Sequence, residues 1–313
     1  MHGALLVDKP RGPTSHDIVS FARRTLKTPG IGHTGTLDPL ATGLLVLLVG
    51  HATRLSQFLV TDEKEYIADI RLGIATATYD AQGLDRARDV GSDRGQTGVR
   101  PGVDPGLTPG PERIAGVLAE FLGTFPQMPP PFSAKKIAGE RAYKKARRNE
   151  PVELKPVAVT VKALEVLSDG SDPTLLRLRI VCSSGFYVRS LAHDIGQLLG
   201  CGAHLEGLRR TRAGQFAVAD ALTLDAIEAA GESLGSRLVD LHTLLAGMPP
   251  VTLTDEGNRR AWNGNTLAPQ HLEDALSMPA DASKVRVLAP SGTVLAVAER
   301  RPDGLLHPLV VLR

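Results

Sequence analysis

The chain has 313 residues and a formal net charge of +2, with 42% hydrophobic and 22% charged residues. This size allows one large domain and one small one. Two cysteines exclude a disulfide framework, and no segment approaches the roughly 20 apolar residues that cross a bilayer. No Cys/His cluster has metal-ligand spacing, and the N-terminus lacks a signal peptide. We therefore predict a cytoplasmic protein without a metal site or membrane contact.

The first elements are a short strand over residues 5–7, a turn over 8–13, and a helix that Thr14 or Ser15 caps. Pro29 and Gly30 end that helix. In the turn, Lys9 precedes Pro10, and this spacing by itself favours a turn residue over a base that faces a phosphate.

The segment 32–43 concentrates chemistry in twelve residues: three glycines, His33, three threonines and Asp38. It runs into an apolar stretch over 44–50, which predicts a buried strand and a rigid base for the loop. Glycine at this density lets a backbone adopt positive φ or approach a ligand closely. The structural alternative is that Asp38 and Pro39 form a turn or a helix start, in which Asp38 is the cap and Pro39 takes the first helical position.

Further along, residues 64–73 alternate as a strand that places Tyr66 at the start of its apolar face. Residues 86–111 are polar and without period, which predicts a surface insertion. A short helix follows over 114–122, and then a proline-rich stretch that can be neither helix nor central strand. The segment 134–155 holds eight bases against three acids. Such a run indicates a polyanion contact, with a solvated basic helix as the alternative.

Two alternating runs over 157–167 and 175–182, separated by turn residues, predict a hairpin. The segment 183–189 then opens a helix. Arg189 lies near its start, where the helix dipole disfavours a cation, so we expect an anionic group to offset it. After a strand over 203–212, residues 248–313 are predicted to form a small, separate all-β module.

Several of these stretches together resemble one family, the bacterial tRNA pseudouridine-55 synthases of the TruB family. Segment 32–43 resembles its signature loop, and the remaining motifs follow in the family's order. They are 8–15, 66–73 with 80–83, 131–136 with 141–143, 183–191, and 202–205 with 208–210.

The resemblance implies an α+β pseudouridine synthase fold with a mixed, largely antiparallel sheet flanked by helices. A catalytic domain over 1–247 would carry the surface insertion 86–111 and a basic thumb over 128–155 that grips RNA. Residues 248–313 resemble a PUA domain, a small all-β barrel that binds RNA. The implied reaction is isomerisation of uridine to pseudouridine at position 55 of the TΨC loop, which needs no cofactor because nothing is oxidised or added.

The resemblance also assigns residues. Asp38 would act on the ribose as nucleophile or base, Arg189 would be its partner, and Tyr66 would stack on the flipped uracil. The remaining seven are expected to bind substrate. Lys9, Lys136 and Arg141 would meet phosphates, Asp80, Tyr187 and Leu208 would line the pocket, and His33 would fill space in the opened RNA loop.

Two alternatives stay open at this point. A related guide-RNA-dependent catalytic subunit shares the aspartate motif but needs partner proteins, and the basic thumb and short N-terminus favour the stand-alone form. The other alternative is an RNA-binding or folding factor in which Asp38 is only a cap. We expect a monomer that binds the T-arm stem-loop of tRNA without a guide RNA.

Overall fold

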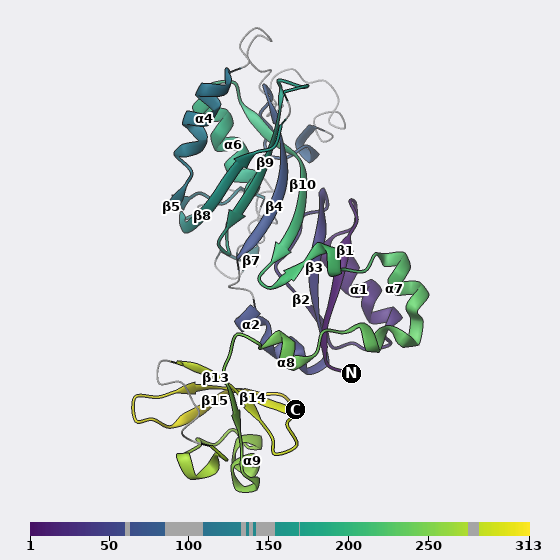
Figure 1. Ribbon diagram of the computed structural model, residues 1–313. Helices are drawn as coiled ribbons and strands as arrows, with labels where there is room; N and C mark the ends of the chain where they lie inside the picture. The colour runs from purple at the N-terminus through teal and green to yellow at the C-terminus, as the bar shows by residue number, and fades with distance from the viewer. Residues whose placement is uncertain are drawn as a thin grey trace.

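The computed structural model describes residues 1–59, 63–84, 109–132, 136–137, 140–141, 154–168, 170–274 and 282–313. Within these residues a nine-stranded sheet runs in the order β1-β3-β10-β4-β9-β8-β5, with β2 added beside β3 and β11 beside β10 (Figure 1). The strands are β1 (Gly3–Lys9), β2 (Ile31–Thr34), β3 (Ala41–Val49), β4 (Lys64–Leu72), β5 (Gly123–Gln127), β8 (Val157–Val166), β9 (Leu175–Cys182), β10 (Ala203–Ala213) and β11 (Phe216–Ala217).

Every pair of neighbouring strands in this sheet is antiparallel except β3 and β10, which run parallel and bring Leu208 opposite Ala41. The mixed, largely antiparallel sheet of the predicted α+β fold is thus confirmed. Gly43 allows the parallel contact. It has a φ of +95°, and a Cβ there would lie 2.3 Å from the carbonyl oxygen of Arg210. Only glycine fits such a backbone approach.

Helices cover the buried face of the sheet. α6 (Val188–Leu199) packs on β10 and β4, and α4 (Pro111–Ala119) packs on α6. α1 (Ser15–Thr25) is capped by Thr14, whose hydroxyl accepts a hydrogen bond from the backbone N–H of Asp17 in a capping box. The remaining helices are η1 (Gly50–Leu55), α2 (Ser56–Leu59), η3 (Val218–Asp220), α7 (Leu224–Ala230), η4 (Gly231–Arg237), α8 (Leu241–Leu244), α9 (Asp255–Trp262) and η5 (Pro269–His271).

Strand periodicity explains both faces of the sheet. In β4 the buried residues are Lys64, Tyr66, Ala68, Ile70 and Leu72, as the alternation predicted.

The predicted hairpin is β8 and β9, which pair antiparallel. The proline-rich stretch begins inside β5, but β5 is the last strand of the sheet, so Pro126 lies on an edge where a missing N–H is tolerated.

The insertion 86–111 lies outside the described residues except for 109–111. The thumb 128–155 is described only over 128–132, 136–137, 140–141 and 154–155. In it, β6 (Lys136–Ile137) and β7 (Glu140–Arg141) form a two-stranded hairpin that places Lys136 opposite Arg141.

The C-terminal module is a four-stranded sheet with one α-helix among its described residues. Its strands are β12 (Pro250–Thr252), β13 (Lys284–Leu288), β14 (Val294–Arg300) and β15 (Leu306–Val311), in chain order across the sheet. Because α9 packs Ala261 into the module's core, the all-β prediction is wrong. α9 buries only Gly257 and Ala261, so its sequence carries no apolar stripe that would reveal a helix.

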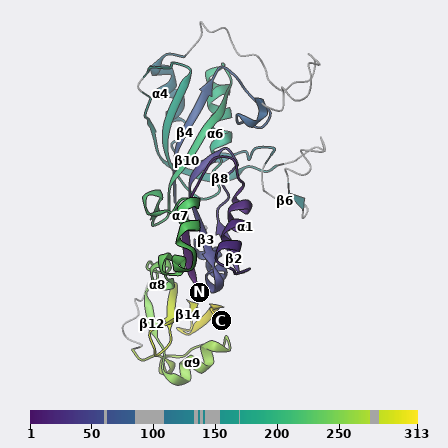
Figure 2. The same ribbon diagram turned by 90° about the vertical axis from the view of Figure 1, so that its right-hand side faces the viewer.

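The module lies at one end of an elongated molecule, with α4 and α6 toward the other end in both views (Figure 1 and Figure 2). A separate apolar cluster joins it to the rest, with Leu55 and Leu245 packed against Val294, Val297 and Leu312. Arg54 also donates to the carbonyl of Val311, and Arg286 donates to that of His242. The module is therefore docked on η1, α2 and α8.

Candidate active site

Asp38 lies in the loop between β2 and β3, held by contacts on both sides. Leu37 and Leu40 flank it and are 3% and 4% exposed, which anchors the loop in the core. The hydroxyl of Ser15 accepts from the backbone N–H of Leu37 at 2.8 Å and donates to its carbonyl at 2.9 Å. Asp38 opens a turn over Pro39 and Leu40, in which the N–H of Ala41 donates to the carbonyl of Asp38 at 3.0 Å. The turn alternative therefore holds for its backbone, whereas the helix alternative is wrong, because β3 begins at Ala41.

Arg189 of α6 forms an ion pair with Asp38, from Nε to Oδ2 at 2.9 Å. The Arg189 side chain is 8% exposed, whereas that of Asp38 is 35% exposed. Asp80 approaches the same guanidinium from behind, at 3.5 Å from Nη1, with a side chain only 2% exposed. The anionic partner expected for a cation at this helix start is therefore two carboxylates, one buried and one open to solvent.

Further contacts fix the Arg189 guanidinium. Nη2 donates to the carbonyl of Phe132 at 3.0 Å, and Nη1 lies 3.4 Å from that of Thr78. Asp80 is held in turn by the Thr78 hydroxyl at 2.6 Å and the Gln82 N–H at 3.1 Å. Burial raises the pKa of Asp80, and the hydrogen bond from Thr78 and the charge of Arg189 oppose that shift. Arg189 can therefore turn little without breaking contacts to three segments.

A cavity of about 250 Å³ opens in front of Asp38. It brings together five of the predicted site residues: Asp38, Tyr66, Tyr187, Arg189 and Leu208. The other lining residues are Gly35, Thr36, Leu37, Lys64, Ser184, Gly185, Phe186, Val188 and Arg210.

The wall of the cavity opposite the loop comes from two paired strands. Tyr66 of β4 lies directly across from Arg210 of β10, and Ala68 lies across from Leu208. Tyr66 is 7% exposed, and burial raises its pKa, which keeps the phenol protonated at neutral pH. The wall thus presents an aromatic ring and an aliphatic side chain, with Arg210 beside them.

Arg210 is a site residue that sequence reasoning did not select. It is 1% exposed, and its guanidinium donates to the carbonyls of Leu44 at 2.7 Å and Gly35 at 3.1 Å. The Arg210 side chain therefore links the loop that carries Asp38 to β10. The signal was present: residues two apart in a strand share a face, so placing Leu208 in the pocket also places Arg210 there.

Lys9 contradicts its expected role. The resemblance implied a phosphate contact, but Lys9 has 0% exposure. Its ammonium donates to the carbonyls of Ala41 at 2.7 Å and Pro10 at 2.9 Å. Burial lowers its pKa to about 8, although the charge of Asp38 acts in the opposite direction. In this structure Lys9 braces the backbone beside the Asp38 loop.

Two other predicted residues, Asp80 and His33, do not line this cavity. Asp80 is behind Arg189, as described above. His33 lies on β2, opposite Leu47, and burial lowers its pKa. The side chains of Lys136 and Arg141 are outside the described part of the chain. Tyr187 lines the cavity, and its backbone pairs with the amide of Gln127 through bonds of 2.8 and 3.0 Å that fix the start of α6.

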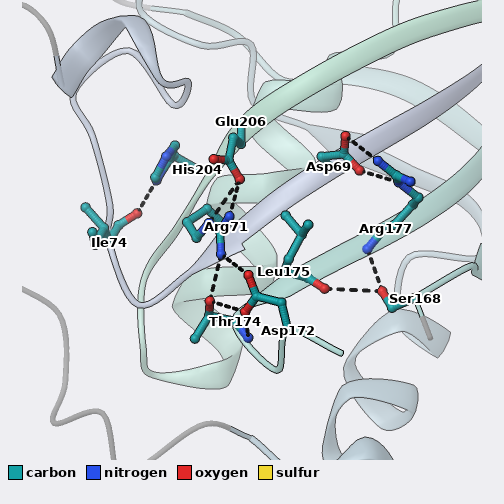
Figure 3. A network of polar contacts seen from close by, with 10 residues as sticks. All are labelled: Asp69, Arg71, Ile74, Ser168, Asp172, Thr174, Leu175, Arg177, His204 and Glu206. Carbon is teal, nitrogen blue, oxygen red and sulfur yellow. Dashed lines mark hydrogen bonds and ion pairs between the residues drawn. The ribbon is translucent and has the colours of Figure 1, made fainter. Parts of the chain in front are cut away.

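The opposite face of the same strands carries a set of ion pairs, part of which is seen in Figure 3. Asp69 pairs with Arg177 at 2.6 Å, and Arg71 joins Asp172 at 2.6 Å and Glu206 at 2.8 Å. We call this surface the ion-pair ladder. Its other members in the described residues are Glu63, Glu65, Lys162, Glu165, Arg179 and Arg212.

No group of three or more His, Cys, Asp or Glu side chains among the described residues could hold a metal ion. No helix in the same part of the chain is long and apolar enough to span a membrane.

The chain matches two family models. The model of the TruB family pseudouridylate synthase N-terminal domain matches residues 23–101 and 102–188, and that of the tRNA pseudouridylate synthase B C-terminal domain matches 189–246. Proteins named tRNA pseudouridine synthase B are similar over the whole length. The one from Solibacter usitatus is 40% identical, covering 100% of both chains. The one from Thermobifida fusca is 40% identical, covering 99% of this chain and 98% of that one.

Solved structures share the fold. A Cbf5–Nop10–Gar1 complex matches with a TM-score of 0.69 at 24% identity, covering 99% of this chain and 85% of that one. An H/ACA RNP bound to a substrate RNA containing 2′-deoxyuridine matches with a TM-score of 0.68 at 22% identity, covering 99% and 85%. From the family models and the full-length relatives together, this chain belongs to the TruB family of pseudouridylate synthases.

Proposed function

We propose that this protein isomerises uridine to pseudouridine at position 55 in the TΨC loop of tRNA. The observation that carries the proposal is the 2.9 Å ion pair between Arg189 and a solvent-accessible Asp38 at a cavity that also holds Tyr66. The relatives that are about 40% identical over the full chain bear the name tRNA pseudouridine synthase B, which supports tRNA as the substrate.

The reaction breaks the bond between ribose C1′ and uracil N1, turns the base, and joins C1′ to C5. The proton on C5 leaves and N1 gains one, so the change is internal to the nucleotide. Asp38 is the carboxylate that can act on the ribose, either as nucleophile at C1′ or as base toward a ribose proton. The adjacent guanidinium of Arg189, 2.9 Å away, holds this carboxylate in position for either route.

The target base must leave its stack to reach Asp38, and enzymes that act on a base flip it into a pocket. We propose that Tyr66 stacks on the flipped uracil, since base–aromatic stacking contributes about 1–3 kcal/mol. Leu208 and Tyr187 would line the space around the ring. His33, at the outer end of β2, would enter the opened RNA loop.

Charge indicates which face meets the RNA. The ion-pair ladder nearly balances its acids with its bases, so it offers no excess of positive charge to a phosphate backbone. The basic run of the thumb follows directly after Phe132, whose carbonyl binds Arg189. We therefore propose that the tRNA lies across the cavity and is held by the thumb, including Lys136 and Arg141.

The division into a catalytic domain over 1–247 and an RNA-binding domain over 248–313 is also part of the proposal. The separate apolar core of the C-terminal sheet supports it. The PUA resemblance and the monomeric state stay predictions. Deleting residues from Pro250 onward is expected to weaken tRNA binding and to leave catalysis measurable. Loss of all turnover in a folded truncation would contradict this division.

The decisive experiment incubates purified protein with an unmodified T-arm stem-loop transcript and maps pseudouridine at single-nucleotide resolution. We expect conversion at position 55 without guide RNA or partner proteins. A need for guide RNA would favour the guide-dependent alternative. In parallel, Asp38→Asn should bind the stem-loop as the unmodified protein does but form no pseudouridine. Retained isomerisation by Asp38→Asn would refute the catalytic assignment.

A further inference from the structure

Tyr79, the residue that precedes Asp80, has an uncommon backbone conformation. Its φ is +64°, and among the described non-glycine residues only Lys27 shares a positive value. A bulky residue rarely adopts this left-handed conformation, which persists only where the surroundings enforce it. The residue must therefore be held by contacts on more than one side.

Two sets of contacts hold Tyr79. Its backbone is fixed to β10, where the N–H of Leu205 donates to its carbonyl at 3.0 Å and the carbonyl of Leu205 accepts from Ala81 at 2.9 Å. Its ring is stacked on that of His193, with centroids 3.9 Å apart and planes inclined by 13°. Burial raises the pKa of Tyr79 and lowers that of His193, so both rings are neutral at pH 7.

The two ends of this stack lie beside the two members of the buried ion pair. Tyr79 adjoins Asp80 in the chain, and His193 lies one helical turn after Arg189 on α6. Residues four apart on a helix share a face. The stack therefore ties the loop that carries Asp80 to the helix that carries Arg189, on the same face as the guanidinium.

We propose that the Tyr79–His193 stack is a positioning device that sets the Asp80 loop against α6 and so orients Arg189 toward Asp38. The inference extends the proposed function and rests on it. Neither ring lines the cavity, so both act through Arg189 and neither touches the substrate. The hydroxyl of Tyr79 is not required, whereas its ring is.

The test uses the full-length protein with an unmodified T-arm stem-loop. Tyr79→Gly removes the ring and also relieves the left-handed strain, which offsets part of the stability that is lost with the ring. His193→Ala removes the other ring. We expect each to lower kcat by about tenfold to a hundredfold with KM unchanged, because a small misplacement of a catalytic group has that cost. The matched controls Tyr79→Phe and His193→Phe keep a stack and should keep kcat.

The double variant Tyr79→Gly/His193→Ala tests the pairing itself. We expect it to be no slower than the slower single variant, since the second substitution removes nothing that remains. Multiplied losses, unchanged kcat in both single variants, or a loss confined to KM would each overturn the proposal. Conversion of the stem-loop by the unmodified protein tests the proposed function separately.

A structure of the Tyr79→Gly variant tests the proposal without relying on an activity measurement. It should show Asp80 moved out of ion-pair distance of Arg189. An Asp80 that keeps its place would contradict the proposed device.

Discussion

One strand, β4, supplies charged and aromatic groups to two different regions. On one face, Asp69 and Arg71 belong to the ion-pair ladder, where Arg177 is 51% and Asp172 is 43% exposed. On the other face, Tyr66 lies at the cavity in which Arg189 is 8% exposed. Both regions contain arginine–carboxylate pairs with similar distances, between 2.6 and 2.9 Å. Distance therefore does not separate the two regions, but the exposure of the arginine does, at 8% for Arg189 against 26% for Arg71 and 51% for Arg177.

This difference decides what each pair can do. Water and salt screen the exposed pairs, so each contributes about 0–1 kcal/mol to stability. At the cavity, Arg189 has little contact with water and Asp80 behind it is nearly inaccessible, so removing one partner leaves a charge uncompensated. The ladder thus keeps the open face of the sheet soluble, while the buried group holds Asp38 in a defined electrostatic environment.

The largest expected effect comes from Arg189→Gln. Breaking a buried pair costs about 3–5 kcal/mol, and we expect a stability loss of that size. Pseudouridine formation should fall on the order of a hundredfold in the protein that remains folded. Arg177→Gln on the ladder is the matched control, with a stability change of at most about 1 kcal/mol and normal activity. Urea unfolding and stem-loop turnover measure both, and equal effects would abolish the contrast between the regions.

A smaller effect is expected for Asp80→Asn. Its amide oxygen can still accept from Thr78 and Gln82, so only the charge beside Arg189 is lost. We expect kcat to fall about tenfold with KM for the stem-loop unchanged, because Arg189 is then less well oriented. Thr78→Val, which removes the hydroxyl and keeps the carboxylate, should lose less. Unimpaired kcat in Asp80→Asn would mean that Asp38 alone orients the guanidinium.

The ion-pair ladder should affect the thermal stability of the protein at low pH. The Thr174 hydroxyl and the Arg71 guanidinium lower the pKa of Asp172 from 3.8 to about 2. A carboxylate with a depressed pKa in the folded state stabilises the protein above its unfolded pKa and loses that contribution as the pH falls toward 2. Asp172→Asn should therefore make the decrease in thermal stability between pH 3.8 and about pH 2 less steep. A profile identical to that of the unmodified protein would show that the pair contributes nothing.

The smallest effect is the coupling within one exposed pair. A double-mutant cycle with Asp69→Asn and Arg177→Gln should give a coupling energy of about 0.2–1 kcal/mol. Raising the ionic strength should shrink it, since salt screens exposed charges. The measurement is the free energy of unfolding at two salt concentrations. A coupling that resists salt would place this pair in the same class as the buried one.

Much of the site could be predicted from local patterns. The cap at Thr14, the alternation of β4 and the hairpin of β8 and β9 each rest on neighbours in the sequence. The unfavourable dipole at Arg189 indicated an anionic partner, and the resemblance identified it as Asp38. The structure places these two side chains in contact across about 150 residues of chain.

Three outcomes escaped local reasoning because they depend on what lies across the fold. Lys9 is enclosed by β3, and its ammonium group donates to the backbone carbonyl of Ala41. The strand pattern places Arg210 on the same face as Leu208, but its hydrogen bond to Gly35 in the Asp38 loop is a long-range contact that no short pattern reveals. α9 buries two small residues against a sheet formed from later segments, so its own sequence lacks a stripe.

The sequence, through its local patterns and the family resemblance that they carry, predicted the α+β character, most of the elements and a set of candidate site residues, because periodicity, caps and motifs are local properties. The tertiary structure alone decided which charged side chains are screened and which are enclosed. Burial belongs to no single segment: it arises where α6, the Asp38 loop and the Asp80 loop meet, and it makes Arg189 a different group from Arg177.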